Sequence, residues 1–234
     1  MRSCLPGDTH ARFHPKVRTI HSKGAVIKQI DPVLTDMEAN YLRAKARGKF
    51  QASETEGLTN NVRTSWTAYP PSDNVLKCLE RRFSKIAGMP AAALEELQVS
   101  EYSHGEFYKP HLDCLEREDE PQRVKTLLTY LNDRGLQHGR CGGATSFPRL
   151  RTEDGEPLRI YPKKGRALLW ENLTEHGSPN RFTLHAGEPL TCNRRKSVLN
   201  AWILNTPRKK ASSRARKSAQ KQRGAQKARH RPLL

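Results

Sequence analysis

Short apolar runs separated by glycine and proline dominate residues 97–204, and they predict a domain that is mainly β. Residues 97–102 largely alternate between apolar and polar side chains, as a half-buried strand does. Further strands are predicted at residues 123–131, 144–148, 167–170 and 196–204. Glycine or proline turns at residues 142–143 and 162–165 separate them. Several strands with this punctuation favour a β-sandwich or barrel.

Two helices are predicted ahead of these strands. The first begins near Leu34, because Thr35 suits an N-cap and Glu38, three residues later, completes a capping box. The second covers about residues 72–86, where apolar residues recur at helical spacing, and Gly88 ends it.

Charge is concentrated at the C-terminus of this basic chain, whose formal net charge is +18. Residues 208–231 contain 11 Lys and Arg and no acidic residue. Such a segment buries too little apolar surface to order itself, so we predict a disordered polybasic tail at 207–234. It is typical of a nuclear-localisation signal or of non-specific binding to nucleic acid or an acidic partner. A solvated tail that only aids solubility is the alternative.

One catalytic domain is expected, because 234 residues that are 35% hydrophobic suffice for one core. We place it at residues 25–206, after an N-terminal extension at 1–24. The first thirty residues show no apolar leader, and no stretch approaches membrane-spanning length. We therefore expect no membrane partner and a cytoplasmic or nuclear location.

The five cysteines are odd in number, scattered and without a Cys-x-x-Cys pair; they are Cys4, Cys78, Cys114, Cys141 and Cys192. This pattern argues against a zinc ribbon and against a disulfide framework. We expect Cys114 and Cys141 to be thiols, which fits a reducing compartment.

The chain also contains a candidate metal site. His111 and Asp113 are two residues apart, and His185 follows 74 residues after His111. Two imidazoles and one carboxylate hold non-haem Fe(II) and leave positions open for substrate and oxygen. On a strand, positions 111 and 113 share one face. His-x-Asp alone is a weak signal, and His176 competes with His185 as the distal ligand.

The surrounding motifs resemble, in order, those of the prolyl 4-hydroxylase family of Fe(II)- and 2-oxoglutarate-dependent dioxygenases. The matching positions are Tyr102-x-x-Gly105-x-x-Tyr108-x-Pro110-His111-x-Asp113, Arg123-x-x-Thr126-x-Leu128-x-Tyr130-Leu131-Asn132, Gly142-Gly143-x-Thr145-x-Phe147-Pro148, Pro162-x-x-Gly165-x-Ala167-Leu168-Leu169, Leu184-His185-Ala186-Gly187-x-Pro189-Leu190, and Lys196 with Asn200-x-Trp202-Ile203. The resemblance covers roughly residues 25 to 205. It implies an α+β, mainly β fold with a double-stranded β-helix (jelly-roll or cupin-like) core that N-terminal helices buttress.

The resemblance also implies site residues and cofactors. The predicted iron ligands are His111, Asp113 and His185, and the predicted 2-oxoglutarate residues are Tyr102, Thr145, Lys196 and Trp202. Tyr108 and Arg123 match positions that contact the peptide substrate. Fe(II), 2-oxoglutarate and O2 are the implied cofactor and cosubstrates, with ascorbate as reductant.

One departure from the family's spacing concerns the cosubstrate lysine. The family usually has a lysine ten residues after the distal histidine, and here Arg195 stands at that position. Counting back from Asn200-x-Trp202-Ile203 favours Lys196, with a one-residue insertion in the preceding turn.

The function implied is hydroxylation of peptidyl proline with O2 and 2-oxoglutarate, releasing succinate and CO2, as in procollagen-proline 4-dioxygenases. The basic tail motivates an alternative, a 2-oxoglutarate oxygenase of the same fold acting on nucleic acid or another protein side chain. A second alternative is a non-catalytic, basic, nucleic-acid-associated protein. The presence of all three ligand residues and the lysine argues against that loss of catalysis.

Overall fold

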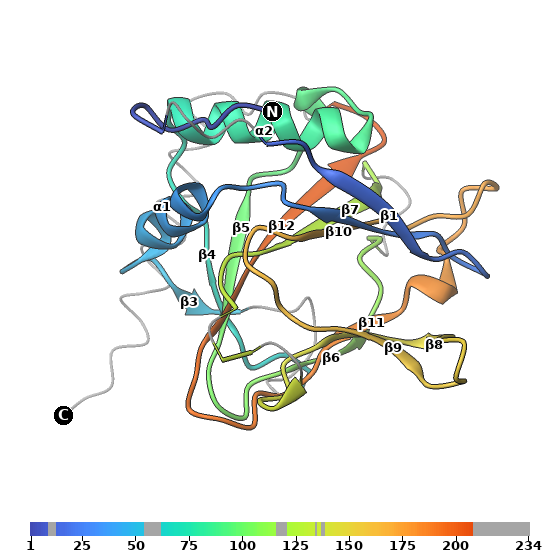
Figure 1. Cartoon of the computed structure of the whole chain (residues 1–234). Coiled ribbons are helices and arrows are strands. Elements are labelled where there is room, and N and C mark those ends of the chain that lie inside the picture. The colour runs from blue at the N-terminus through green and yellow to red at the C-terminus, as the bar shows by residue number, and fades with distance from the viewer. Residues whose placement is uncertain (9–12, 54–61, 116–120, 134, 137–138, 208–234) are drawn as a thin grey trace, which may run out of the picture.

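A computed structural model describes residues 1–8, 13–53, 62–115, 121–133, 135–136 and 139–207 of the protein. Two antiparallel sheets lie one above the other, and the helices cover the outer side of the larger sheet (Figure 1). The predicted double-stranded β-helix core with buttressing helices is confirmed.

The larger sheet contains most of the predicted strands. Its order is β1 (Lys16–His21), β2 (Ile27–Asp31), β10 (Ala167–Glu171), β7 (Arg123–Tyr130), β12 (Lys196–Leu204), β5 (Gln98–Tyr102), β4 (Trp66–Ala68) and β3 (Gln51–Ala52). The smaller sheet has the order β6 (Tyr108–His111), β11 (His185–Gly187), β8 (Thr145–Arg151) and β9 (Pro157–Ile160).

Alternation along the central strands produces two apolar layers. Leu127 of β7 and Leu199 of β12 pack toward the helices, in one cluster with Phe83. Tyr130 and Val198 of the same two strands point the other way, into a second cluster between the sheets. Successive side chains of a strand point to opposite faces, so one buried sheet separates a structural core from an inner cavity.

The two predicted helices are present. In α1 (Asp36–Ala46), Thr35 is the N-cap and forms the expected capping box with Glu38. Helix α2 (Asn74–Ala87) has Asp73 as its N-cap, and Gly88 ends it in the left-handed conformation with φ of 68°. Glycine adopts this conformation without the steric penalty that a Cβ atom brings.

A buried ion pair joins the two helices. Glu38 is fully buried, and its two carboxylate oxygens accept hydrogen bonds of 2.7 and 2.8 Å from the guanidinium of Arg82. Glu38 also accepts from the backbone N–H groups of Cys4 and Thr35. The N-terminal segment, α1 and α2 therefore meet at one carboxylate.

The N-terminal segment contributes to the structured part of the chain. Residues 1–24, predicted as an extension, contain β1, which pairs with β2 at the edge of the larger sheet. Arg82 donates a hydrogen bond to the carbonyl of Arg2. The domain boundary at residue 25 stays a prediction.

The expected thiol at Cys141 is wrong, and so is the argument against disulfide bonds. Cys4 is bonded to Cys78 and Cys141 to Cys192, with Cα–Cα distances of 5.7 and 5.1 Å. Bridging requires Cα atoms about 4.4–6.8 Å apart, a tertiary condition that sequence separations of 74 and 51 residues do not disclose. Cys114 belongs to neither pair. The cysteines therefore no longer support a reducing compartment.

The predicted tail falls almost wholly beyond this description, because residues 208–234 lie outside the described residues. Its disorder and its binding stay predictions. Among the described residues, no helix combines the length and the apolar character that crossing a bilayer requires.

Replacing Glu38 with Gln tests the buried ion pair. The change leaves the Arg82 charge buried without its counter-ion, and breaking such a pair costs about 3–5 kcal/mol. We expect urea unfolding to show a loss of that size in the free energy of unfolding. As the control, Glu171→Gln removes the carboxylate of the Lys125–Glu171 pair, whose glutamate side chain is 57% exposed. That variant should lose about 1 kcal/mol or less. Equal losses in both variants would contradict the assigned role of Glu38.

Candidate active site

The pairing of β11 with β6 brings two histidines together. His185 lies directly opposite His111 in the strand register, although 74 residues separate them in the sequence. Each Nδ1 lies at hydrogen-bond distance from the carbonyl two residues earlier, 2.8 Å for Lys109 and 3.0 Å for Thr183. A carbonyl only accepts, so both Nδ1 atoms carry the proton and both Nε2 atoms keep a free lone pair.

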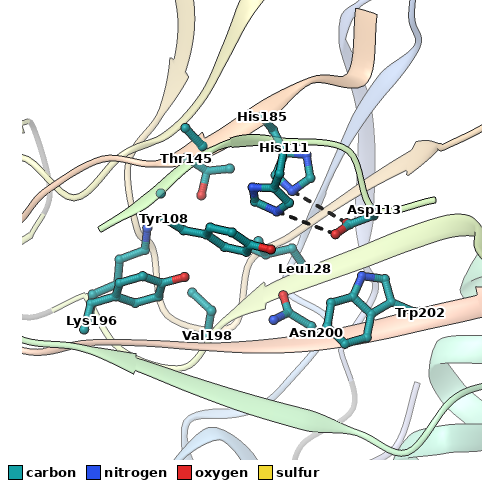
Figure 2. A pocket seen from close by; sticks show the side chains of 13 residues that line it. Tyr108, His111, Asp113, Leu128, Thr145, His185, Lys196, Val198, Asn200 and Trp202 are labelled. Carbon is teal, nitrogen blue, oxygen red and sulfur yellow. Dashed lines mark ion pairs between the residues drawn. The ribbon is translucent and has the colours of Figure 1, made fainter. Parts of the chain in front are cut away.

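Asp113 completes the cluster from just beyond the end of β6. Its two carboxylate oxygens lie 3.7 Å from Nε2 of His111 and 3.6 Å from Nε2 of His185. Figure 2 shows both imidazoles directed at this carboxylate. The three ligand atoms lie within 4.8 Å of one another. The expectation that positions 111 and 113 share one strand is not met, because β6 ends at His111, yet both side chains still reach the same point.

Protonation in this cluster suits a metal ion. Burial, together with the neighbouring His185, lowers the pKa of His111 to about 3. Burial alone would raise the pKa of Asp113, but His185, His111 and a hydrogen bond from Thr126 outweigh it and lower that pKa. Neutral imidazoles and an ionised carboxylate are the forms that bind a cation. The donor set therefore fits ferrous iron.

A cavity between the two sheets opens beside the cluster. Its lining side chains come from both sheets; they are Tyr102, Tyr108, His111, Asp113, Leu128, Thr145, His185, Ala186, Gly187, Lys196, Val198, Asn200 and Trp202. Alternate residues of β12 supply four of them, at positions 196, 198, 200 and 202 (Figure 2). Eight of the nine predicted site residues line this cavity, and Arg123 is the exception.

Lys196 places a buried cation in the cavity. The residue is 2% exposed, and its register partner across the sheet is Tyr102, whose ring centroid lies 5.2 Å from Nζ. Within the described part of the chain, no carboxylate forms a salt bridge with it, and burial lowers its pKa to about 7. A buried ammonium without a counter-ion is costly, so the cavity fits an anionic ligand.

The other predicted cosubstrate residues line the same cavity, but Trp202 lies at its opposite end, six residues further along β12 (Figure 2). Thr145 lies beside Gly187 in the strand register, and Tyr130 Oη lies 2.9 Å from its hydroxyl oxygen. Gly143, before β8, packs so closely that a Cβ there would lie 2.6 Å from a methyl carbon of Leu190. The wall that carries Thr145 is therefore held tightly against the segment that leads to Lys196.

Two aromatic side chains border the metal cluster. The ring of Tyr108 stacks on His111 with centroids 3.5 Å apart, and the guanidinium of Arg63 lies 4.6 Å from the Tyr108 centroid. Trp202 also lines the cavity. Arg123 lies behind it, with its guanidinium 3.8 Å from the indole centroid.

Arg123 is held there by Glu95. The guanidinium donates two hydrogen bonds of 2.7 and 2.9 Å to the two carboxylate oxygens. Because Arg123 does not line the cavity, its predicted contact with a peptide needs a substrate that reaches beyond the lining residues.

The sequence left two alternatives open: His176 in place of His185, and Arg195 in place of Lys196. The positions of these side chains distinguish them. His176 has a side chain that is 84% exposed and pairs with Glu175, away from the cluster. Arg195, at the family's usual spacing, is 67% exposed and pairs with Glu101. Lys196 is thus the cation in the cavity.

Asn200 lines the cavity, although the sequence-based predictions did not include it. Its amide donates to Gln98 and Ser100 at 3.3 Å each. The signal was present in the sequence, because Asn200 shares strand parity with Lys196 and Trp202.

Residues 97–204 match the family model of the 2OG-Fe(II) oxygenase superfamily, where 2OG is 2-oxoglutarate. The prolyl 4-hydroxylase subunit alpha-1 of Rattus norvegicus is 30% identical over 188 residues, which is 73% of this chain and 33% of that protein. Prolyl 4-hydroxylase 2 of Arabidopsis thaliana is 29% identical over 216 residues, 80% of this chain and 70% of that protein. The chain thus spans about a third of the length of the rat subunit.

A solved structure shows the same likeness. The viral collagen prolyl hydroxylase of Paramecium Bursaria Chlorella virus-1, in complex with 2OG, is 27% identical. It superimposes with a TM-score of 0.61, covering 77% of this chain and 96% of that one.

The Lys196 environment predicts a pH-dependent stability of the metal-free, ligand-free protein. The folded-state pKa is about 7, whereas an unfolded lysine titrates near about 10.4. Between these two pKa values the Lys196 amine is protonated in the unfolded state and neutral in the folded state. The free energy of unfolding therefore rises with pH, by up to about 1.4 kcal/mol per pH unit. Below pH about 7 the contribution is constant.

We expect the difference in unfolding free energy between Lys196→Met and the wild type to shrink as pH rises from 7 to 10. Lys163→Met, at a side chain that is 52% exposed, is the control and should show no such trend. Parallel pH profiles for wild type and Lys196→Met would contradict the placement of Lys196.

Proposed function

Because this chain is a prolyl 4-hydroxylase-like 2OG-Fe(II) oxygenase, we propose that it hydroxylates proline residues in peptide chains. The observation that supports this best is that one cavity contains both cation-binding side chains and a buried cationic side chain. Three cation-binding donors, His111, Asp113 and His185, line the same cavity as Lys196, whose ammonium has no salt-bridge partner among the described residues. An iron ion and a dicarboxylate satisfy these two needs together.

In this proposal His111, Asp113 and His185 hold Fe(II) through two Nε2 atoms and one carboxylate. Bound iron supplies oxygen activation, coupled to the conversion of 2-oxoglutarate to succinate and CO2, and ascorbate serves as reductant. The backbone carbonyls of Lys109 and Thr183 hold the imidazole rings in the ligating tautomer.

Lys196 pairs with the distal carboxylate of 2-oxoglutarate, which supplies a counter-ion for this buried ammonium. Tyr102 and Thr145 give hydroxyl groups to the remaining lone pairs of that carboxylate. Trp202 closes the cavity on the side of Asp113 (Figure 2). The enclosed setting excludes water from the reacting groups.

The proline ring would lie between Tyr108 and Trp202, the aromatic side chains that border the metal cluster. Aromatic walls suit extended proline-rich segments, which lose little entropy on binding. Arg123, fixed by Glu95 behind Trp202, would donate hydrogen bonds to the peptide backbone beyond the cavity.

The polybasic segment 208–231 supports a further proposal about partners. Eleven positive charges without an acidic residue favour salt-sensitive contact with nucleic acid or an acidic protein surface. The segment lacks aromatic residues for base stacking, so sequence-specific recognition is not expected.

Turnover is the direct test of the proposed activity. Purified protein with Fe(II), 2-oxoglutarate, ascorbate and oxygen should release succinate faster when a proline-rich peptide is added. The peptide should gain about 16 Da on proline by mass spectrometry, the mass of one oxygen atom. An alanine-substituted peptide should do neither. Stimulation by methylated single-stranded DNA, and not by the peptide, would favour the nucleic-acid alternative.

His111→Ala should reduce this turnover by more than about 100-fold, beyond the loss typical of a residue that only supports a ligand. His176→Ala is the matched control, because His176 is exposed and does not belong to the cluster. Full turnover by the His111 variant would contradict the assignment of His111 as a metal-binding residue.

Deleting residues 208–234 should leave peptide turnover within about twofold while weakening nucleic-acid binding at low salt, since the electrostatic contribution to binding is lost. Filter binding at two salt concentrations measures the second effect. An equal loss of both properties would show that the tail serves the active site.

A further inference from the structure

We propose that Thr126 and Asn172 are positioning residues that orient the Asp113 carboxylate for metal binding. The inference rests on the proposed function, because it assigns these residues to the same metal cluster. Neither residue lines the cavity, so both act through Asp113.

Asp113 needs a separate orienting contact because of where it lies. Strand β6 ends at His111, so the ladder that fixes the two histidines does not extend to Asp113. The residue is nevertheless buried, at 6% exposure. Among the described residues, the Thr126 hydroxyl is its one side-chain hydrogen-bond donor, at 2.7 Å from Oδ2.

The direction of the Thr126 hydrogen bond follows from Asn172. The Asn172 amide nitrogen donates to the carbonyl of Arg123 at 3.1 Å, which fixes the orientation of the amide. The same nitrogen lies 3.0 Å from the Thr126 hydroxyl and donates to it. Thr126 therefore accepts from Asn172 and directs its single proton to Asp113.

Asn172 Oδ1 is a second possible acceptor for the Thr126 hydroxyl, but it is weaker than the Asp113 carboxylate. Asn172 Oδ1 lies 3.2 Å from the Thr126 hydroxyl, whereas the carboxylate oxygen of Asp113 lies 2.7 Å away and is charged. Hydrogen bonds to ionised acceptors are shorter and about twice as strong as neutral ones. The relay thus runs from Asn172 through Thr126 to Oδ2 of Asp113.

Strand β7 holds Thr126, and a backbone hydrogen bond holds Asn172 just after the end of β10. Thr126 lies within β7, between its register partners Trp170 of β10 and Trp202 of β12. The backbone N–H of Asn172 donates to Val124 at 2.8 Å. Thr126 and Asn172 are each 1% exposed, so water has little access to replace the relay.

The relay has a consequence for the metal site. With Oδ2 engaged by Thr126, the carboxylate resists rotation about its terminal bond. Oδ1, the oxygen 3.7 Å from Nε2 of His111, has no hydrogen-bond donor among the described residues. Its lone pairs remain available to a cation. Groups that support a metal ligand in this way typically contribute about 10–100-fold in affinity.

The chain offers a matched control on the same strand. Thr129 of β7 is fully buried, and its hydroxyl has no hydrogen-bond partner in the described structure. It lies on the opposite face from Thr126, in register with Ala167 and Leu199. Thr→Val at either position removes one buried hydroxyl and keeps the side-chain shape.

The experiment measures Mn(II) binding to the full chain by calorimetry without 2-oxoglutarate, together with thermal unfolding. Thr126→Val should weaken Mn(II) affinity by about 10–100-fold, and Thr129→Val should leave it unchanged. Thr126→Ser, which retains the hydroxyl, should bind within about threefold of wild type, and Asn172→Ala should weaken binding in the same direction as Thr126→Val. If Thr126→Val does not fold, Thr126→Ala takes its place.

Wild-type Mn(II) affinity in Thr126→Val, alongside lost affinity in His111→Ala, would overturn the positioning role and leave the proposed function standing. Equal weakening in Thr126→Val and Thr129→Val would also overturn it, because a general packing effect would then explain both. Unchanged affinity in His111→Ala would instead remove the metal site itself.

Discussion

The antiparallel pairing of β11 with β6 builds the candidate active site. It sets His185 against His111 and presents both Nε2 atoms to Asp113. The pairing is possible only because two sheets close over a shared apolar layer, whose largest members include Trp170, Tyr130 and Phe147. The fold thus converts a separation of 74 residues into a cluster of donors within 4.8 Å.

The charges of the lining residues determine which ligands the cavity suits. Asp113 and the two imidazoles form one end, which favours a cation, and Lys196 forms another part of the wall, which favours an anion. Each group is buried, so each is costly until its partner binds. The cavity therefore suits a metal ion at one end and a dicarboxylate beside Lys196.

Local patterns predicted local features well. The capping box of Thr35 and Glu38 and the strand at 196–204 appear where the sequence placed them, because caps and alternation act over a few residues. The ordered motifs also named three donors that do converge and a lysine that lines the same cavity, while the roles of these residues stay predictions. The disulfides, the position of Arg123 against Trp202 and the Asn172–Thr126 hydrogen bonds were not predicted, because each depends on which distant segments the fold brings together.

A crystal structure of the protein grown anaerobically with Mn(II) and 2-oxoglutarate would locate both ligands. We expect an anomalous peak in direct bonding contact with His111, Asp113 and His185, and a cosubstrate carboxylate paired with Lys196. A metal ion bound elsewhere, or a 2-oxoglutarate molecule that leaves Lys196 without a partner, would contradict this expectation.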